Sequence, residues 1–282
     1  MSRVFISVDM EGVAGIATLD QILRGGHGYP RAQQLMTAEA NAAIRGAYAG
    51  GATEVLVNDS HGTMDNLLPD ELDPRARLLT GAPKPSCMVQ GIDRDHRVAL
   101  FVGYHAAATD IGVLAHTFSS NFTEVRVNGQ PVSEAEVNAL LAAHVGVPVG
   151  LVTGDDQICD VAEKAFPGVR TVAVKSAHGF AASESVHPTA ACDDIEQAAA
   201  EAVYHAANLQ PVSLPDDFTI EADIASQLGA DYAANVPRCE RVSAHTVRSR
   251  AADAPELMAV ITSWYYLVAL AAQQMSQIAH RR

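Results

Sequence analysis

The amino-acid sequence predicts an α/β protein built on a mostly parallel sheet with helices on both faces. Strand-like runs of β-branched residues alternate with segments of helical periodicity for most of the 282 residues. This alternation is typical of strand–helix–strand units, which produce parallel pairing and place helices over both faces of the sheet. Two interruptions of the pattern add an inserted β-hairpin and a smaller C-terminal α+β domain to the prediction.

The expected strands are short apolar runs bounded by polar residues or glycines. They are Arg3–Asp9, Thr53–Asn58, Val98–Tyr104, Pro148–Thr153 and Val169–Val174. The expected helices lie between the strands and show apolar residues at helical spacing. They are Ala32–Tyr48, Glu134–His144, Gln157–Ala165 and Pro188–Ala206.

Two segments depart from the alternating pattern. Asn121–Val132 has a strand-like pattern on both sides of Asn128-Gly129, a dipeptide that favours the tight turn of a β-hairpin. The segment PVSLPDD, which begins at Pro211, contains two prolines and interrupts the helical pattern. We therefore expect a catalytic α/β domain over residues 1–210 and a smaller α+β domain over residues 211–282.

The composition of the chain argues against some classes of partner and favours one cellular compartment. The formal net charge of −14 argues against nucleic acid and anionic membranes, which both need a basic surface. The four cysteines are scattered without a C-x-x-C pair, which favours reduced thiols in the cytoplasm. We expect no signal peptide, because Asp9 and Glu11 interrupt the apolar run near the start. The apolar segment Leu257–Ala272 is short for a membrane span and is expected to be a buried or interface helix.

Two carboxylates follow directly after the first expected strand. Asp9 and Glu11 are two residues apart, so on an extended segment their side chains point the same way. Two converging carboxylates repel each other unless a positive charge lies between them, and a metal ion is a common solution. Solvated acids at a strand end are the alternative explanation for this pair alone.

Further polar side chains follow the other expected strands. Because ligands of open α/β sheets gather at the carboxyl ends of the strands, we expect these side chains at one edge. Each has an ordinary explanation when taken singly, such as a turn residue, a core histidine or a helix-capping acid. Together they favour a metal site, and the mixture of imidazole and carboxylate suits zinc, manganese or cobalt better than magnesium. They are Asp59, Ser60, His61, His105, Asp155 and Asp156, with His116 in a following loop and Glu134 opening a helix.

One interpretation of this edge is a phosphohydrolase. Asp9 with an acid two residues later resembles the start of the haloacid-dehalogenase family, in which that aspartate is the nucleophile. Ser60, Lys175 and the acidic segment at residues 154–160 would then take the family's other positions. The resemblance departs at Glu11, where that family has aspartate, and it gives the histidines no role. A metal-binding protein without catalysis is a further alternative.

A second resemblance accounts for the histidines. The chain resembles the zinc-dependent D-aminopeptidase family over most of its length and in the same order. The motifs that carry the resemblance are SVDMEG at residues 7–12, EVLVNDSHG at 54–62, LFVGYHA at 100–106, AHTF at 115–118 and PVSEAEVNALLA at 131–142. GAPKPSCMVQG at 81–91 and VPVGLVTGDD at 147–156 extend it.

This resemblance implies a two-zinc aminopeptidase that releases N-terminal residues, such as D-Ala, from short peptides. Asp9 would bridge the two zinc ions, with Glu11, His61, His105 and Glu134 completing their coordination. His116 matches the family's catalytic histidine, as a nucleophile or a general base, whereas Asp155 and Asp156 would support a loop. The resemblance also implies a homo-oligomer, such as a decamer of stacked rings. The preference for D over L residues depends wholly on the resemblance.

Overall fold

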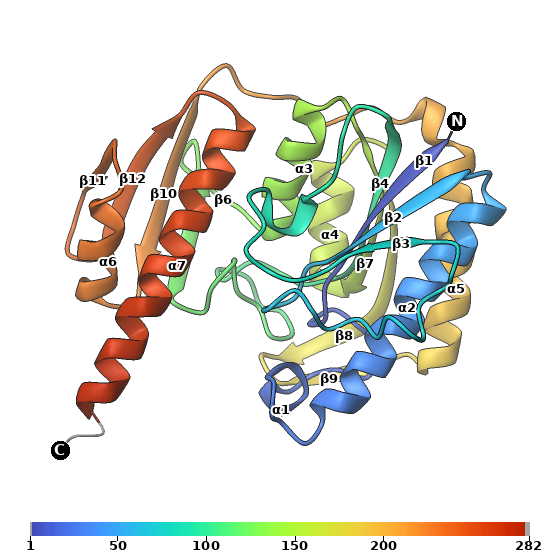
Figure 1. The fold of residues 1–282 in the computed structure, drawn as a ribbon, viewed down its shortest axis with the longest axis horizontal. Helices are drawn as coiled ribbons and strands as arrows, with labels where there is room; N and C mark the ends of the chain where they lie inside the picture. Colours follow the sequence, from blue (N-terminus) through green and yellow to red (C-terminus); the bar gives the residue numbers. More distant parts are fainter. Residues whose placement is uncertain (1, 280–282) are drawn as a thin grey trace.

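A seven-stranded sheet forms the centre of the computed structural model, which describes residues 2–279 (Figure 1). The strand order is β3-β2-β1-β4-β7-β8-β9. All neighbouring strands pair in parallel except β9, which runs antiparallel to β8 at the edge. The strands are β1 (Arg3–Val8), β2 (Glu54–Asp59), β3 (Arg77–Leu79), β4 (His96–Tyr104), β7 (Val149–Asp155), β8 (Arg170–Gly179) and β9 (Ala182–Ser185).

The strand order reverses direction between β1 and β4. From β1 the chain moves outward to β2 and β3, and it then returns to place β4 on the other side of β1. Such a reversal is the point at which open α/β sheets bind ligands, because the loops at the carboxyl ends of the two strands diverge and leave a crevice. The predicted ligands Asp9 and His105 follow these two strands.

Helices cover both faces of the main sheet, as the sequence predicts. Helices α2 (Tyr29–Ala49) and α5 (Pro188–Tyr204) pack against each other and share one apolar core with the sheet. Helices α3 (Glu134–His144) and α4 (Asp156–Ala165) belong to the core on the opposite face. Both α2 and α5 begin with a proline in their first turn, where the missing N–H costs no hydrogen bond.

A second sheet lies beside the first and is antiparallel (Figure 1). Its order over the described residues is β11-β12-β10-β5-β6. The strands are β5 (Phe122–Val127), β6 (Gln130–Pro131), β10 (Phe218–Ile224), β11 (Cys239–Arg241) and β12 (Thr246–Ala251). Helices α6 (Gln227–Ala234) and α7 (Ala254–Ala279) pack on it. The predicted fold class, including the hairpin and the C-terminal α+β part, is confirmed.

The predicted hairpin is β5–β6, with its turn at Asn128-Gly129, and it joins the second sheet. Strand β5 pairs antiparallel with β10, from Ile220 opposite Val127 to Ile224 opposite Phe122. Residues 122–131 therefore share a sheet and an apolar core with strands that lie beyond residue 211. The division of the chain into domains at residue 210 stays a prediction.

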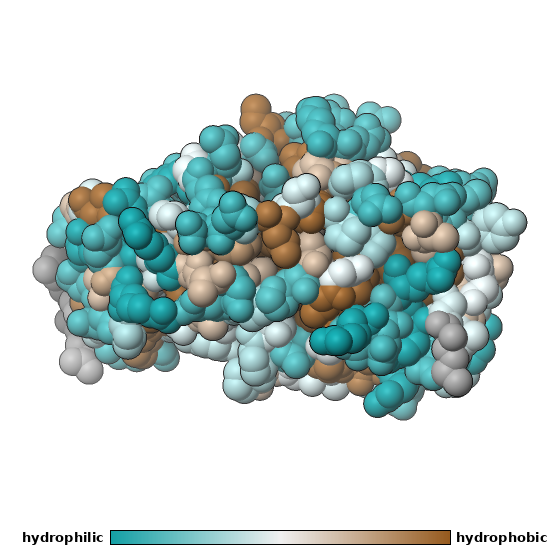
Figure 2. Space-filling view, turned by 90° about the horizontal axis from the view of Figure 1, so that it is seen from above, coloured by the Kyte–Doolittle hydropathy of each residue, from teal (hydrophilic) through white to brown (hydrophobic). Residues whose placement is uncertain are grey.

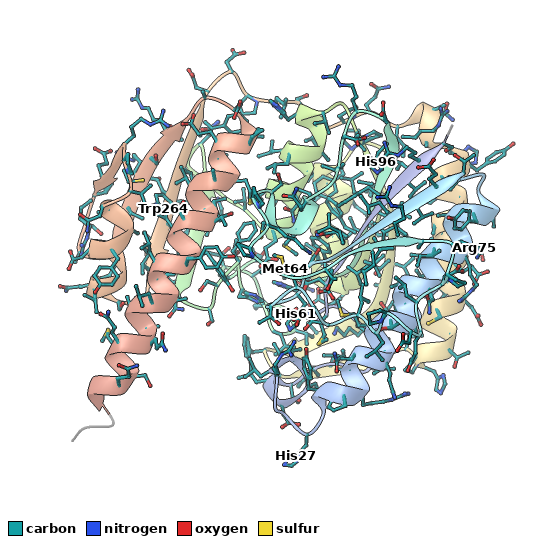
Figure 3. The ribbon with its side chains drawn as sticks, viewed as in Figure 1. His27, His61, Met64, Arg75, His96 and Trp264 are labelled. Carbon is teal, nitrogen blue, oxygen red and sulfur yellow. The ribbon has the colours of Figure 1, made fainter. Side chains whose placement is uncertain are left out.

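Helix α7 contains the apolar segment Leu257–Ala272. It is long and apolar enough to cross a membrane by length and composition, but 44% of its most apolar window is buried within the protein. Leu257, Ile261 and Trp264 are fully or almost fully buried, and Trp264 lies between the helix and the second sheet (Figure 3). One face of α7 thus packs in the core, which agrees with the expectation of a buried or interface helix for this segment.

The elements that the sequence did not reveal are short. They are strands β3, β9 and β11, helix α1 (Leu19–Ile22) and the 3₁₀ turns Cys87–Val89 and Ala206–Asn208. Three or four residues give too little periodicity to distinguish a strand from a loop.

The surface seen from above is mostly hydrophilic, with scattered apolar patches (Figure 2).

Candidate metal centre

A cavity of about 1180 Å³ lies between the carboxyl edge of the main sheet and helix α7. Asp9, Glu11, His61, His116 and Glu134 line it, and His105 is buried beside them. His61 lies in the region between the two sheets (Figure 3). The structure therefore brings all six predicted site residues to one place.

Asp9 and Glu11 lie in the loop after β1 and face His61 from the loop after β2. The Nδ1 atom of His61 is 2.9 Å from Oε2 of Glu11 and 3.5 Å from Oδ1 of Asp9. All three side chains are buried, and one ligand atom from each lies within 4.8 Å of the others. These three residues form the first half of the centre.

The second half consists of His105, His116 and Glu134. Glu134 Oε1 is 3.5 Å from Nε2 of His105 and 3.6 Å from Nε2 of His116. The two imidazole rings stack with their centroids 4.3 Å apart. Glu134 also accepts a hydrogen bond from the backbone N–H of Phe118, which fixes one of its oxygens. Capping by Ser133, whose side chain accepts from Glu136 N–H, fixes the start of the helix that carries Glu134.

Each of the three histidines has one ring nitrogen against a backbone carbonyl. A carbonyl oxygen only accepts, so the facing nitrogen carries a proton, and the other nitrogen faces the carboxylates, where it could bind a metal ion. This arrangement is the usual support for a metal-binding imidazole. The pairs are His61 Nε2 with Ile22 O, His105 Nδ1 with Ala106 O and His116 Nδ1 with Leu114 O, each at 2.9 Å.

The carboxylates and imidazoles perturb one another strongly. Burial, followed by repulsion from Glu11, raises the pKa of Asp9 to about 8. Burial also acts to raise the pKa of Glu11, but attraction to His61 outweighs it and holds that pKa well below its ordinary value. Burial acts to lower the pKa of His105, but Glu134 and Asp9 raise it to about 10. So many buried acids in one place favour a bound cation.

Two buried atoms at the junction of the halves have no hydrogen-bond partner within residues 2–279. They are Oδ2 of Asp9 and Nε2 of His105, which lie 3.5 Å apart. A buried polar atom without a partner is costly, and a metal ion satisfies a carboxylate oxygen and an imidazole nitrogen together. The predicted donor set of three carboxylates and two imidazoles fits zinc. The residues present therefore fit the metal that the sequence predicts.

The other polar residues at this edge support loops. Asp155 caps helix α4 by accepting from Ile158 N–H, and its second oxygen accepts from Val113 N–H at 2.8 Å. Asp156 accepts from the backbone N–H of Ala177 at 2.9 Å. Both aspartates thus bond to backbone, in line with the supporting role that the resemblance implies for them.

The loop that holds His61 depends on a residue that sequence reasoning missed. Asn66 donates its side-chain N–H groups to Asp59 Oδ1 at 2.8 Å and to the His61 carbonyl at 2.6 Å. Tyr29 donates its hydroxyl proton to Asn66 Oδ1 at 2.6 Å. No motif in the sequence distinguishes Asn66, because it bonds to a backbone carbonyl nearby and to Tyr29, which lies 37 residues earlier.

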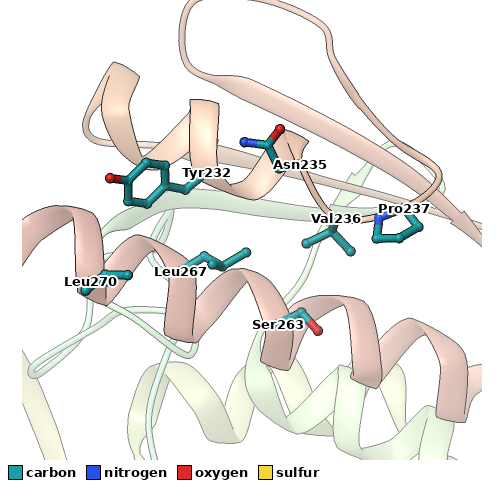
Figure 4. Close-up of a pocket in the computed structure, with 7 residues that line it drawn as sticks. All are labelled: Tyr232, Asn235, Val236, Pro237, Ser263, Leu267 and Leu270. Atoms are coloured by element: carbon teal, nitrogen blue, oxygen red, sulfur yellow. The ribbon is translucent and has the colours of Figure 1, made fainter.

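The cavity wall opposite the carboxylates comes from helix α7. Ile261, Thr262 and Tyr265 line it, more than 120 residues beyond the metal-site motifs. A second cavity, of about 660 Å³, lies on the far side of the same helix against α6 (Figure 4). Its lining includes Tyr232, Val236 and Leu270 and, among the described residues, no acid and no histidine. Among the described residues, the groups of acids and histidines that could hold a metal ion lie at the first cavity.

Comparison with known proteins agrees with this geometry. A family model described as D-aminopeptidase matches residues 2–263. The chain belongs to the D-aminopeptidase family. The D-aminopeptidase of Bacillus subtilis (strain 168) is 36% identical over 252 residues, which cover 89% of this chain and 92% of the relative. A solved structure described as the Zn-dependent D-aminopeptidase DppA from Bacillus subtilis, a self-compartmentalizing protease, is similar with a TM-score of 0.88 and 34% identity. That match covers 94% of this chain and 97% of the other.

Membership of the D-aminopeptidase family makes the chain a metallo-aminopeptidase and sets the phosphohydrolase interpretation aside. The side chains agree with this outcome. Lys175 donates to three backbone carbonyls, and Ser60 is hydrogen-bonded within a buried network with Ser7. Lys175 does not line the cavity, and the Ser60 hydroxyl is already hydrogen-bonded within the protein. The non-catalytic alternative is likewise set aside.

Proposed function

We propose that the chain binds two zinc ions through Asp9, Glu11, His61, His105 and Glu134, and hydrolyses short peptides from their amino terminus with His116 as the catalytic histidine. The observation that carries this proposal is the position of Asp9. One of its oxygens faces His61 in the first half of the centre, and the other faces His105 in the second half. A carboxylate in that position suits a bridge between two ions.

Zinc ions bound there would supply an activated water and polarise the scissile carbonyl. The chain's own residues supply the rest of the chemistry. Asp9, Glu11 and Glu134 would hold the ions at the floor of the cavity and offset part of their positive charge. His116 is one-quarter exposed, and its Nε2 faces the cavity side of Glu134, so this nitrogen can take up and return a proton.

The walls of the cavity favour a short peptide with apolar side chains. Leu114, Phe118 and Phe180 line it together with the α7 residues Ile261 and Tyr265. A volume of about 1180 Å³ accommodates a few residues and excludes a folded protein. We propose N-terminal D-residues such as D-Ala as the preferred substrates, because the relatives are named D-aminopeptidases.

The same relatives support a proposal about the assembly of the subunits, and the cysteines support one about the compartment. DppA is described as self-compartmentalizing, so we propose that this chain is a homo-oligomer whose subunits enclose their active sites. A decamer of stacked rings is the arrangement that the resemblance implies. We propose the cytoplasm as the compartment, in agreement with the scattered thiols of the sequence.

Hydrolysis of matched peptides tests the function. Purified protein, stripped with a chelator and then reloaded with zinc, should cleave D-Ala-containing dipeptides only after reloading, with about two zinc ions per chain by elemental analysis. The L-Ala dipeptides serve as the stereochemical control. Equal cleavage before and after stripping would contradict the metal mechanism, and preference for the L-peptide would contradict the proposed substrate.

A further inference from the structure

Lys175 on strand β8 is buried, and all three of its ammonium protons are engaged. Its Nζ donates to the backbone carbonyls of Glu11 at 2.5 Å, Val13 at 2.9 Å and Ile16 at 2.6 Å. The side chain is 2% exposed, which is rare for a lysine without a specific role. These three carbonyls belong to one loop, residues 9–16, which carries Asp9 and Glu11.

A second buried charge holds the same loop from another element. Glu39 on helix α2 accepts a hydrogen bond from the backbone N–H of Ala14 at 2.8 Å. It is 2% exposed, and its other oxygen has no partner among the described residues. Lys175 lies close enough to Glu39 to act electrostatically on it. The loop is thus held between the ammonium group of Lys175 on β8 and the carboxyl group of Glu39 on α2.

The loop also lies in close contact with the end of β4. The N–H of Gly12 donates to the Gly103 carbonyl at 2.8 Å, and a Cβ on Gly12 would lie 1.9 Å from the Tyr104 carbonyl oxygen. His105 follows immediately in the chain. The loop with Asp9 and the strand end with His105 therefore have little freedom to move relative to each other.

We propose that Lys175 is a positioning residue, which pre-organises the loop of Asp9 and Glu11 for metal binding, with Glu39 holding the other side of that loop. This inference rests on the two-zinc function proposed above. Neither residue lines the cavity, so neither touches a substrate. Their effect on the metals passes through the backbone of residues 11–16.

Lys175 can position the loop because its one ammonium group donates hydrogen bonds to three of the loop's carbonyl groups. The carbonyls of Glu11 and Ile16 would lose this donor if the ammonium were removed, and that of Val13 would keep only its bond from the N–H of Ile16. Each buried unpaired group is costly. The loop would then move to find other donors, and the carboxylates on it would move as well. Residues that orient metal ligands from behind typically contribute tenfold to hundredfold to metal affinity.

The test compares zinc binding and loop protection in Lys175→Met with those of the unaltered protein. We expect zinc affinity, measured by competition with a chromophoric chelator, to fall roughly tenfold to hundredfold. Amide hydrogen exchange in the zinc-free protein should become faster at residues 11–16. Val247→Ala, in the core of the second sheet, is the matched control. It loses buried contacts without touching the loop, so its zinc affinity should stay unchanged.

A second variant separates positioning from charge balance. Lys175→Met leaves carbonyls without a donor and Glu39 without its neighbouring cation, so the single variant has a stability defect. The double variant Lys175→Met with Glu39→Gln removes the buried carboxyl group and should recover the part of the stability that this group costs, without recovering zinc affinity. Recovery of both together, or a zinc affinity within twofold of the Val247→Ala control, would overturn the proposal.

Amide exchange of the unaltered protein gives a measurement that needs no variant to fold. The proposal requires slow exchange at Ala14 and its neighbours even without zinc, because Lys175 and Glu39 hold the loop in advance. Exchange that slows only when zinc is added would overturn it. Failure of the unaltered protein to bind zinc at all would instead contradict the function proposed above.

Discussion

Asp9 and His105 face each other across the point where the strand order of the main sheet reverses. Oδ2 of Asp9 and Nε2 of His105 are 3.5 Å apart, and both are buried without a hydrogen-bond partner in residues 2–279. Asp9 follows β1 and His105 follows β4, the two strands on either side of the reversal. The two halves of the candidate metal centre are joined by this contact.

Replacing Asp9 with Asn should remove both metals together. The carboxylate faces His61 with one oxygen and His105 with the other, and an amide offers one weaker acceptor and no charge. Elemental analysis of the purified Asp9→Asn variant should therefore find less than one zinc per chain. Glu11→Gln is the matched control, because Glu11 contacts only the first half and its loss should leave one zinc bound. Retention of one tightly bound zinc in Asp9→Asn would rule out a bridging role.

His116→Ala should keep its zinc and its fold but lose most of its turnover. The His116 ring stacks on His105, and it lies in a loop at the cavity wall, where a group that meets the substrate is best placed. We expect kcat to fall by about a hundredfold or more. Zinc content and peptide hydrolysis of the same preparation decide the matter, with the exposed His178→Ala as control. Loss of one zinc would make His116 a ligand, since it lies within ligand distance of Glu134 and His105.

Glu39 should make the stability of the zinc-free protein depend on pH. Burial raises the pKa of Glu39 from 4.5 to about 7. Between these values the folded state binds more protons than the unfolded state, so stability falls as the pH rises through this window. Glu39→Gln lacks this titration, so its free energy of unfolding relative to the parent should rise by about 3 kcal/mol from pH 4.5 to pH 7. Urea unfolding at a series of pH values measures the difference, and a constant difference would contradict the prediction.

Light scattering should find the protein as a homo-oligomer. Helix α7 buries one face in the core but leaves Tyr266, Leu270 and Met275 exposed, so apolar surface is available for contacts between subunits. We expect a mass several times the 29.7 kDa of one chain, independent of zinc content. A monomer at micromolar concentration would reject the ring assembly and leave the metal site untouched.

Most of the fold was predictable because each long element carries its own pattern. The predicted helix Glu134–His144 matches α3 at both ends, since Ser133 and Glu136 form a capping box that the local sequence encodes. The hairpin turn at Asn128-Gly129 was predictable for the same reason. Its membership of the second sheet was not, because pairing with β10 depends on residues about 90 positions later.

The grouping of the site residues was predictable because parallel strands deliver their following loops to one edge. Each of Asp9, His61 and His105 directly follows or lies close behind a strand, and the structure brings them together. The residues that hold these ligands in place could not be predicted from their position after a strand. Lys175 and Asn66 act through backbone carbonyls, and a backbone carbonyl has no signature in a sequence. Their roles become visible only when distant segments meet.

The β5–β6 hairpin lies within the segment between His105, which follows β4, and Glu134, which begins α3. His105 and Glu134, two candidate ligands of the same centre, thus lie at the two ends of one segment. Antiparallel pairing with β10 holds the middle of that segment in the second sheet. A shift of one residue in the pairing of β5 with β10 would displace both ends of this segment. A change that shifts the β5–β10 register would therefore displace both candidate ligands, whereas a substitution that keeps the register, such as Val247→Ala, would leave them in place. Strand β10 therefore contributes to the geometry of the metal centre, although none of the described residues 218–251 lines the cavity.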